Sequence, residues 1–148
     1  MEELSLSTLL QKGIYVEDKQ LFEKRAIVVF NDKYLDIRNI NYDTMLQHMV
    51  EKFTNAIDIS KKNNNCEDFV ILVYLNPKRK NSINKKSMVQ MVIVLNSLFK
   101  KNLYKCIFIN YNIYFKFVLQ TIKPLLETSL RKKFIFSNIT KMNLQYKT

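Results

Sequence analysis

Four short runs of β-branched and aromatic residues constrain the fold of this chain most strongly. The runs are continuous, without alternating polar residues, and they occupy residues 26–30, 69–75, 106–109 and 134–136. Such a run is typical of a strand in a parallel sheet whose two faces are both covered by apolar groups. A strand with one face in water would instead alternate apolar and polar residues. The runs therefore predict four strands of one buried sheet.

Amphipathic segments lie between these runs. Apolar residues recur at helical spacing from Met45 to Ile57, after a cap at Asn41 or Asp43, and again from Met88 to Phe99. A third segment, residues 111–123, is apolar on nearly all sides, and we expect it to be covered on both sides or to line a pocket. Alternating strands and helices predict an α/β fold: a single mixed, mostly parallel sheet covered by helices.

Length and composition limit the possible functions. A chain of 148 residues suits a single domain with one core. With one glycine, Gly13, it has no Gly-rich loop for a nucleotide phosphate. Cys66 and Cys106 are far apart and His48 is the only histidine, so we expect neither a metal site nor a cofactor. His48 and Glu51 suit a shared helix face, but a lone histidine there is more often structural, and we predict no catalytic residue and no enzymatic activity.

Targeting signals are not apparent in the sequence. The N-terminus begins Met1-Glu2-Glu3, which is acidic where a signal peptide is positively charged. No apolar run approaches the roughly 20 residues of a transmembrane helix. We therefore expect a cytoplasmic, intracellular protein with no transmembrane segment.

The positive charge is concentrated in the second half of the chain. Residues 1–68 contain 9 Lys and Arg against 12 Asp and Glu, whereas residues 69–148 contain 15 against one, Glu127. A surface of this sign attracts phosphate, whether in RNA, in anionic lipid or on a protein. Candidate anion contacts are the basic clusters that flank the predicted strands: Lys78, Arg79, Lys80, Lys85, Lys86, Arg131, Lys132 and Lys133. Ordinary solvated charge explains these clusters equally well.

The second half of the chain also resembles a known family. A buried run ends at Asn110, an aromatic-rich segment containing Phe115 follows, and Lys123-Pro124 leads to Arg131-Lys132-Lys133 before the next run. This order and spacing resemble the CRAL-TRIO (Sec14-like) domain, the lipid-pocket fold of phosphatidylinositol-transfer and tocopherol-carrier proteins. Upstream, Asp18-Lys19 before the first run resembles the turn that opens this domain. The resemblance extends over about residues 13–139.

Departures from the family pattern shape the functional expectation. Asn112 stands where the family usually has proline, and the opening turn lacks its glycine. By the resemblance, the chain is a single divergent domain over residues 1–148, without the preceding helical bundle and the C-terminal gating segment. This pattern is similar to the BCH-type branch, whose members act as scaffolds for small GTPases and for self-association.

Three functions remain open on the sequence. The resemblance favours a non-catalytic scaffold that binds another protein and has at most weak lipid binding. The alternatives are a basic subunit of a large ribonucleoprotein or multi-subunit complex that contacts RNA or anionic phosphate, and a phospholipid-binding or transfer protein. For a pocket or a partner contact, the candidates are the apolar residues of the third helical segment: Tyr114, Phe115, Phe117, Val118 and Ile122. Ordinary core packing is the competing interpretation of these residues.

Overall fold

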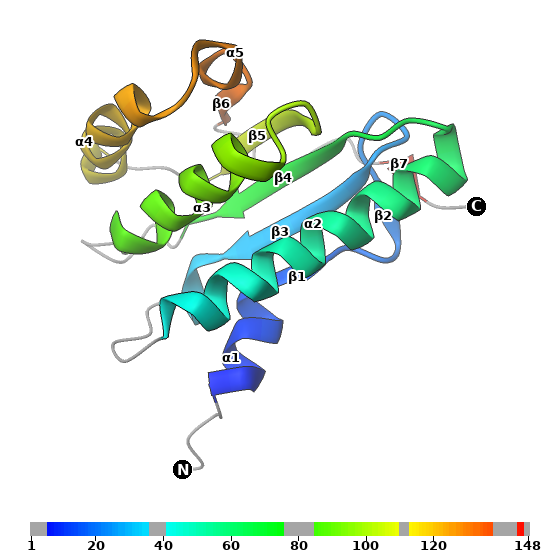
Figure 1. Ribbon diagram of the computed structural model, residues 1–148, viewed down its shortest axis with the longest axis horizontal. Coiled ribbons are helices and arrows are strands. Elements are labelled where there is room, and N and C mark those ends of the chain that lie inside the picture. The colour runs from blue at the N-terminus through cyan, green and yellow to red at the C-terminus, as the bar shows by residue number, and fades with distance from the viewer. Residues whose placement is uncertain (1–5, 36–40, 76–84, 110–112, 138–144, 147–148) are drawn as a thin grey trace.

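The computed structural model describes residues 6–35, 41–75, 85–109, 113–137 and 145–146 (Figure 1). At several element ends, including residues 85–87 and 113–115, only the backbone is described. The elements in chain order are α1 (Leu6–Gly13), β1 (Ile14–Val16), β2 (Gln20–Leu21), β3 (Ala26–Asn31), η1 (Asp32–Tyr34), α2 (Tyr42–Asn64), β4 (Phe69–Tyr74), α3 (Lys85–Leu98), β5 (Leu103–Ile109), α4 (Ile113–Ile122), η2 (Lys123–Leu125), α5 (Thr128–Arg131), β6 (Phe134–Ser137) and β7 (Gln145–Tyr146).

The main sheet has five strands in the order β1-β3-β4-β5-β6. The four predicted runs form β3, β4, β5 and β6, which are all parallel, and β1 pairs with β3 in the antiparallel sense. The predicted mixed, mostly parallel sheet is therefore confirmed. The short strands β2 and β7 pair separately.

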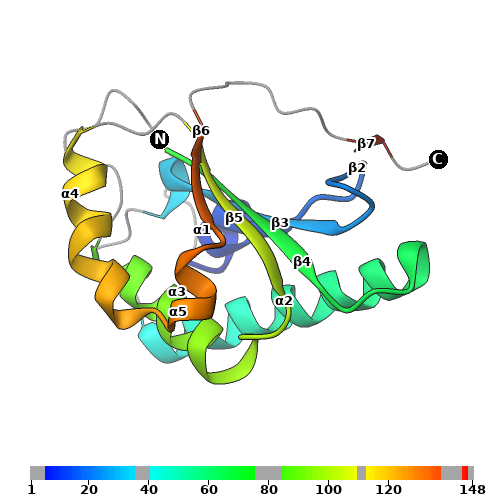
Figure 2. The same cartoon turned by 90° about the horizontal axis from the view of Figure 1, so that it is seen from above.

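The helices cover one face of this sheet. Because the parallel strands follow one another in chain order, right-handed crossovers place every connecting helix on the same side. Figure 2 shows α2, α3 and α5 on that side of the strands. Buried side chains of the helices join one cluster, the helix-side core, which comprises Leu10, Ile14, Ala26, Val28, Phe30, Leu35, Met45, Met49, Phe53, Ala56, Phe69, Ile71, Val73, Leu75, Met88, Met91, Val92, Val94, Leu95, Phe99, Leu103, Cys106, Phe108, Leu119, Ile122, Leu126, Leu130 and Phe134.

Helix α2 illustrates how local sequence sets these elements. Its N-cap is Asn41, whose Oδ1 accepts a 2.9 Å hydrogen bond from the Asp43 N–H. It ends at Asn65, which has the left-handed conformation (φ 53°) common at helix C-termini. Its buried stripe includes Phe53, whose ring stacks on Phe69 of β4 with centroids 4.9 Å apart. The predicted amphipathic helix is thus anchored directly on the sheet.

The second face of the sheet is also apolar. Ile27, Val29, Val70, Leu72, Ile107 and Ile109 are buried there, with Tyr15, Phe22, Tyr74 and Tyr104 packed against them. We call these ten residues the second-face cluster. Within the described ranges this cluster contains no helical residue. The expectation of a sheet covered by helices is met on the first face. The continuous runs of β3, β4 and β5 arise because their alternate side chains serve two separate apolar clusters, whereas the described side chains of β6 join the helix-side core alone and Ile135 is 37% exposed.

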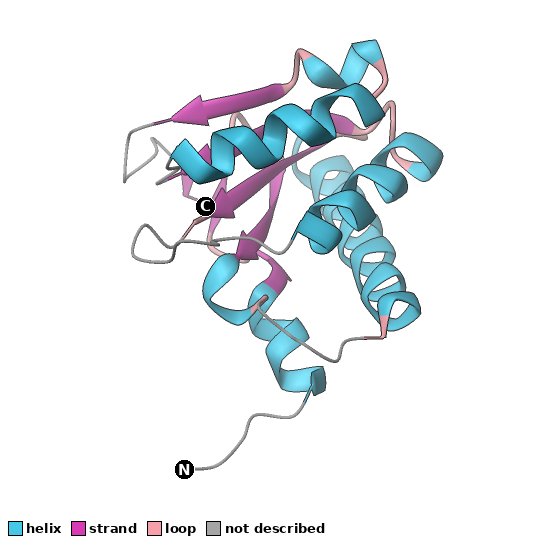
Figure 3. Cartoon of the chain, turned by 90° about the vertical axis from the view of Figure 1, so that its left-hand side faces the viewer, coloured by secondary structure: helices cyan, strands magenta, loops and turns pink. Residues whose placement is uncertain are grey.

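Two helices differ from the sequence expectation. In α4, Leu119 and Ile122 are buried in the helix-side core, but Phe117 is 61% exposed, so this helix is not covered on both sides. Helix α1, which the sequence patterns did not predict, contacts β1, β3 and η1 at one edge of the sheet (Figures 1 and 3). No helix in the described ranges is both long enough and apolar enough to cross a membrane.

Candidate functional site

A cavity of about 270 Å³ lies on the second face of the sheet, away from the helices. Its floor is apolar and consists of Ile27 and Val29 of β3 with Leu72 of β4. Its remaining lining is polar and consists of Tyr15, Glu17, Gln20, Asn31 and Tyr74. An apolar floor with a few convergent polar groups is the usual form of a small-molecule site.

Strand geometry positions the cavity residues. Side chains two apart on a strand share a face, so Ile27, Val29 and Asn31 all project from β3 toward the cavity. Tyr15 of β1 is paired with Val29 in the antiparallel register. The pairing continues past the strand end, where the Glu17 N–H donates a 2.9 Å hydrogen bond to the Ile27 carbonyl. The backbone pairing of β1 with β3 therefore fixes the positions of these cavity residues.

The carboxylate of Glu17 dominates the electrostatics of this cavity. Its Oε1 accepts a 3.1 Å hydrogen bond from the Lys19 N–H, which orients the group. Burial raises the pKa of the Tyr15 and Tyr74 hydroxyls, and the negative charge of Glu17 raises both pKa values further. None of the described residues that line the cavity is basic.

A more open groove of about 450 Å³ lies between the β1 edge and α2, and Tyr15 lines it as well. The groove carries charges of both signs: Asp18, Lys52, Asp58 and Lys62. Its acids therefore have basic side chains in the same lining, which distinguishes the groove from the cavity.

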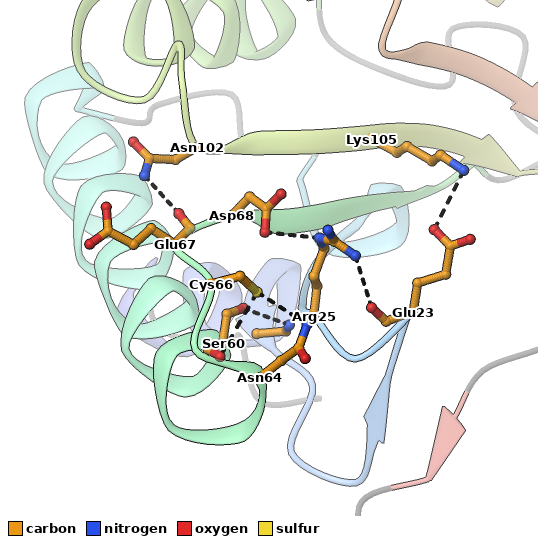
Figure 4. Close-up of polar contacts among 10 residues, drawn as sticks. Glu23, Arg25, Ser60, Asn64, Cys66, Glu67, Asp68, Asn102 and Lys105 are labelled. Carbon is orange, nitrogen blue, oxygen red and sulfur yellow. Dashed lines mark hydrogen bonds and ion pairs between the residues drawn. The ribbon is translucent and has the colours of Figure 1, made fainter.

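A polar cluster joins the amino-terminal ends of the parallel strands (Figure 4). Arg25 Nε binds Asp68 Oδ1 at 2.8 Å, which links the residues just before β3 and β4. The Arg25 guanidinium also lies 3.7 Å from the centre of the Tyr104 ring. Both charged partners are mostly covered, and the ion pair bridges adjacent strands. This arrangement is structural.

Glu23 belongs to the same cluster and lies in a tight turn. A hydrogen bond from Tyr104 lowers the pKa of the Glu23 carboxyl, and Lys105, 3.6 Å away, lowers it further. Glu23 and Lys24 both have positive φ values, 47° and 67°, between the bridged residues Phe22 and Arg25. Such a two-residue turn favours glycine or asparagine.

The predicted anion contacts are only partly described. Lys78, Arg79 and Lys80 lie outside the described residues, and Lys85 and Lys86 begin α3 with only their backbone described. Lys132 is exposed and Lys133 is half-buried, just before β6.

Arg131 has a structural role as well. Its Nε donates to the Leu126 carbonyl at 3.0 Å and its Nη2 donates to the Pro124 carbonyl at 3.3 Å. Both acceptors lie in the connection between α4 and α5. The guanidinium therefore stabilises this connection.

The predicted apolar contacts of α4 divide into two environments. Ile122 is fully buried and Val118 packs against the helix-side core, so neither lines the cavity on the second face. Phe117 points outward. Tyr114 and Phe115 have only their backbone described. Among the three candidates whose side chains are described, Phe117 is the one that the structure leaves accessible to a partner.

Sequence reasoning did not identify the cavity. Tyr15 and Gln20 lie in β1 and β2, which are too short to show a pattern, and Glu17 resembles an ordinary turn residue. The lining residues that the predicted runs place in strands are Ile27, Val29, Leu72 and Tyr74, and Asn31 directly follows the first run.

Other reactive groups are used structurally. His48 Nε2 donates a 2.7 Å hydrogen bond to the Ile14 carbonyl, which ties α2 to β1. Cys106 is buried in the helix-side core, and burial raises its thiol pKa well above the usual value. Among the described residues, no three His, Cys, Asp or Glu side chains gather in a way that would hold a metal ion.

Comparisons with known proteins agree with this architecture. Residues 24–147 match the family described as the divergent CRAL/TRIO domain. The crystal structure of Sfh5 superposes with a TM-score of 0.70 at 16% sequence identity, over 95% of this chain. The chain spans about half of Sfh5, 54% of its length. No curated protein sequence matches. The family match covers most of the chain and the fold agrees with it, so this protein belongs to the family of divergent CRAL/TRIO domains.

Proposed function

We propose that this domain is a non-catalytic binding module that engages a protein partner and retains at most weak lipid binding. Large apolar side chains exposed on the helical layer, outside both apolar clusters, carry this proposal. They are Ile93 and Leu98 of α3, Phe117 of α4 and Leu125 of η2, exposed by 46%, 62%, 61% and 53%. Aromatic and large aliphatic side chains of this kind commonly anchor protein interfaces.

The size of the cavity supports weak lipid binding. Pockets for drug-sized molecules occupy about 300–1,000 Å³. At about 270 Å³ the cavity on the second face falls below this range. It has room for a small molecule but not for the two acyl chains of a phospholipid.

The proposed non-catalytic role is supported by the structural roles of His48 and Cys106. His48 is engaged with a backbone carbonyl, and Cys106 is buried with a raised pKa. A nucleophile needs an accessible, activated side chain with a base in hydrogen-bond reach. Neither side chain meets this requirement.

Native mass spectrometry of the protein isolated from its source tests the proposal. We expect a complex with one additional protein at fixed stoichiometry. Phe117→Ser should abolish this complex without loss of the folded monomer, whereas Thr121→Ser, an exposed position on the same helix, should leave it intact. A monomer that carries phospholipid would contradict the protein-binding role. A complex that still forms with the Phe117→Ser variant would contradict it as well.

A basic surface supports the second candidate, contact with RNA or another anionic phosphate. Residues 96–102 and 123–133 are joined by two hydrogen bonds, from Asn96 Nδ2 to the Leu125 carbonyl and from the Glu127 N–H to Asn96 Oδ1. These two segments contain one acid, Glu127, which is paired with Lys100. Their other basic residues are Lys101, Lys123, Arg131, Lys132 and Lys133.

The salt dependence of assembly separates the two candidates. Each phosphate neutralised gives a log–log slope of about −0.7 to −0.9 in affinity against salt. If the surface binds nucleic acid, charge reversal at Lys132 and Lys133 should reduce this slope and weaken binding. Unchanged assembly of the Lys132→Glu/Lys133→Glu variant at physiological salt would remove this candidate.

A further inference from the structure

The acidic character of the cavity is unexpected in a chain with a net charge of +11. Glu17 is half-buried, and none of the ion pairs among the described residues includes it. Its negative charge faces a lining in which no described residue is basic. The cavity therefore offers a site for a cation.

The other polar groups of the lining suit an ammonium donor. Tyr15 and Tyr74 present hydroxyls whose pKa is raised by burial and by the charge of Glu17, which favours their neutral, protonated form. Hydroxyl and amide oxygens accept hydrogen bonds, and Gln20 adds one such oxygen. Asn31 adds a second, whose other lone pair accepts a 3.1 Å hydrogen bond from the Lys33 N–H. A protonated primary amine has three N–H donors and requires several acceptors, which this lining supplies.

The floor and the volume limit the rest of the ligand. Ile27, Val29 and Leu72 offer only apolar contacts. At roughly 30 Å³ per water molecule, the cavity of about 270 Å³ corresponds to a molecule of roughly nine water volumes. A short alkyl or single-ring body meets both limits.

We propose that this cavity binds a protonated primary amine that carries a short apolar body. The ammonium group is held by Glu17 and the surrounding oxygens, and the apolar body contacts the β3–β4 floor. Anionic ligands are disfavoured here because the sole formal charge in the described lining is negative. This site is separate from the exposed apolar residues of the helical layer, so it does not depend on the proposed protein partner.

Titration calorimetry at pH 7.5 with three probes built on a six-carbon chain tests the assignment. We expect hexylamine to bind at least ten-fold more tightly than hexanoate, which reverses the charge. It should also bind more tightly than hexyltrimethylammonium, which has no N–H donors. Equal binding of hexylamine and hexanoate would overturn the proposal.

Matched variants locate the binding. Glu17→Gln keeps the shape of the side chain and should weaken hexylamine binding at least ten-fold. Glu51→Gln, an exposed position on α2, should leave it unchanged. Thermal unfolding of both variants verifies folding. If Glu17→Gln does not fold, Tyr74→Phe, which removes one acceptor, should still weaken binding several-fold. Unchanged affinity in a folded Glu17→Gln protein refutes the site.

The length of the alkyl chain identifies the source of the amine. A small free amine predicts that affinity rises from butylamine to hexylamine and then stops rising, because the cavity is full. A long-chain lipid base predicts a continued rise through dodecylamine, of about four-fold per buried CH₂. The first outcome supports the proposed short amine, and the second would overturn the short apolar body.

Discussion

The backbone N–H of Ala26 donates a 2.9 Å hydrogen bond to the side-chain Oγ of Ser60, and both residues are fully buried. This bond joins the start of β3 to the last turns of α2 (Figure 4). The N–H of Ala26 has no access to water, so its partner has to come from the protein. Ser60 is the sole polar residue of the buried α2 stripe.

Ser60→Ala should therefore leave a buried donor unsatisfied. We expect a loss of about 1–3 kcal/mol in the free energy of unfolding, measured by urea titration. Ser97→Ala, the same change at an exposed position of α3, is the control and should alter stability by less than about 0.5 kcal/mol. Equal stabilities of the two variants would show that water or another group replaces the serine.

Two leucines of α3 provide a matched test of the helix-side core. Leu95 is fully buried and Leu98 is 62% exposed. Leu95→Ala should cost about 2–5 kcal/mol of unfolding free energy because it removes buried methyl groups and leaves a cavity. Leu98→Ala should cost less than about 0.5 kcal/mol. A small loss at Leu95 would contradict the packing of α3 on the sheet.

The turn before β3 predicts a stabilising substitution. Lys24 has a φ of 67°, a left-handed conformation that costs an L-residue with a Cβ atom roughly 1–2 kcal/mol. Lys24→Gly should consequently be more stable than Lys24→Ala by about 1 kcal/mol, in a comparison of midpoints of thermal unfolding. The alanine variant loses the same side-chain contacts, so the difference isolates the backbone conformation. A more stable alanine variant would be inconsistent with the turn.

The two tyrosines of the cavity predict a loss of stability at alkaline pH. Burial, followed by the charge of Glu17, raises their pKa above 10 in the folded protein. The raised pKa values stabilise the folded protein fully below pH 10. This stabilisation is lost as the pH rises through the pKa values of the folded state, because the unfolded chain releases these protons first. Tyr15→Phe and Tyr74→Phe should each flatten the decline in unfolding free energy between pH 9 and 11. A decline as steep as that of the wild type would argue against buried hydroxyls.

Purified protein should carry no stoichiometric phospholipid. Each CH₂ of an acyl chain that the cavity cannot cover loses about 0.8 kcal/mol of favourable binding free energy. Lipid extraction and a phosphorus assay after gel filtration measure the occupancy. One phospholipid per chain would overturn weak lipid binding and restore a carrier function.

The sequence alone determined the parallel sheet and its main helices. Residues 26–30, 69–75 and 106–109 are apolar without interruption because each of these strands contributes to two apolar clusters, whereas the run 134–136 contributes to the helix-side core alone. The stripe from Met45 to Ile57 likewise needs no knowledge of its neighbours, since the helical period and the Asn41 cap are local properties. The resemblance to the CRAL-TRIO family rests mainly on the later stretch from Asn110 through Lys123-Pro124 to Arg131-Lys132-Lys133.

Only the tertiary structure decided which face the helices cover and where polar groups meet. An apolar run does not reveal which of its side chains face helices, because that depends on the order of the strands and the handedness of the crossovers. Similarly, Glu17, Tyr15 and Tyr74 belong to different segments, and the pairing of β1 with β3 brings them to one cavity. Their shared electrostatic environment depends on distances in the folded structure. These distances cannot be predicted from the spacing of the residues along the chain.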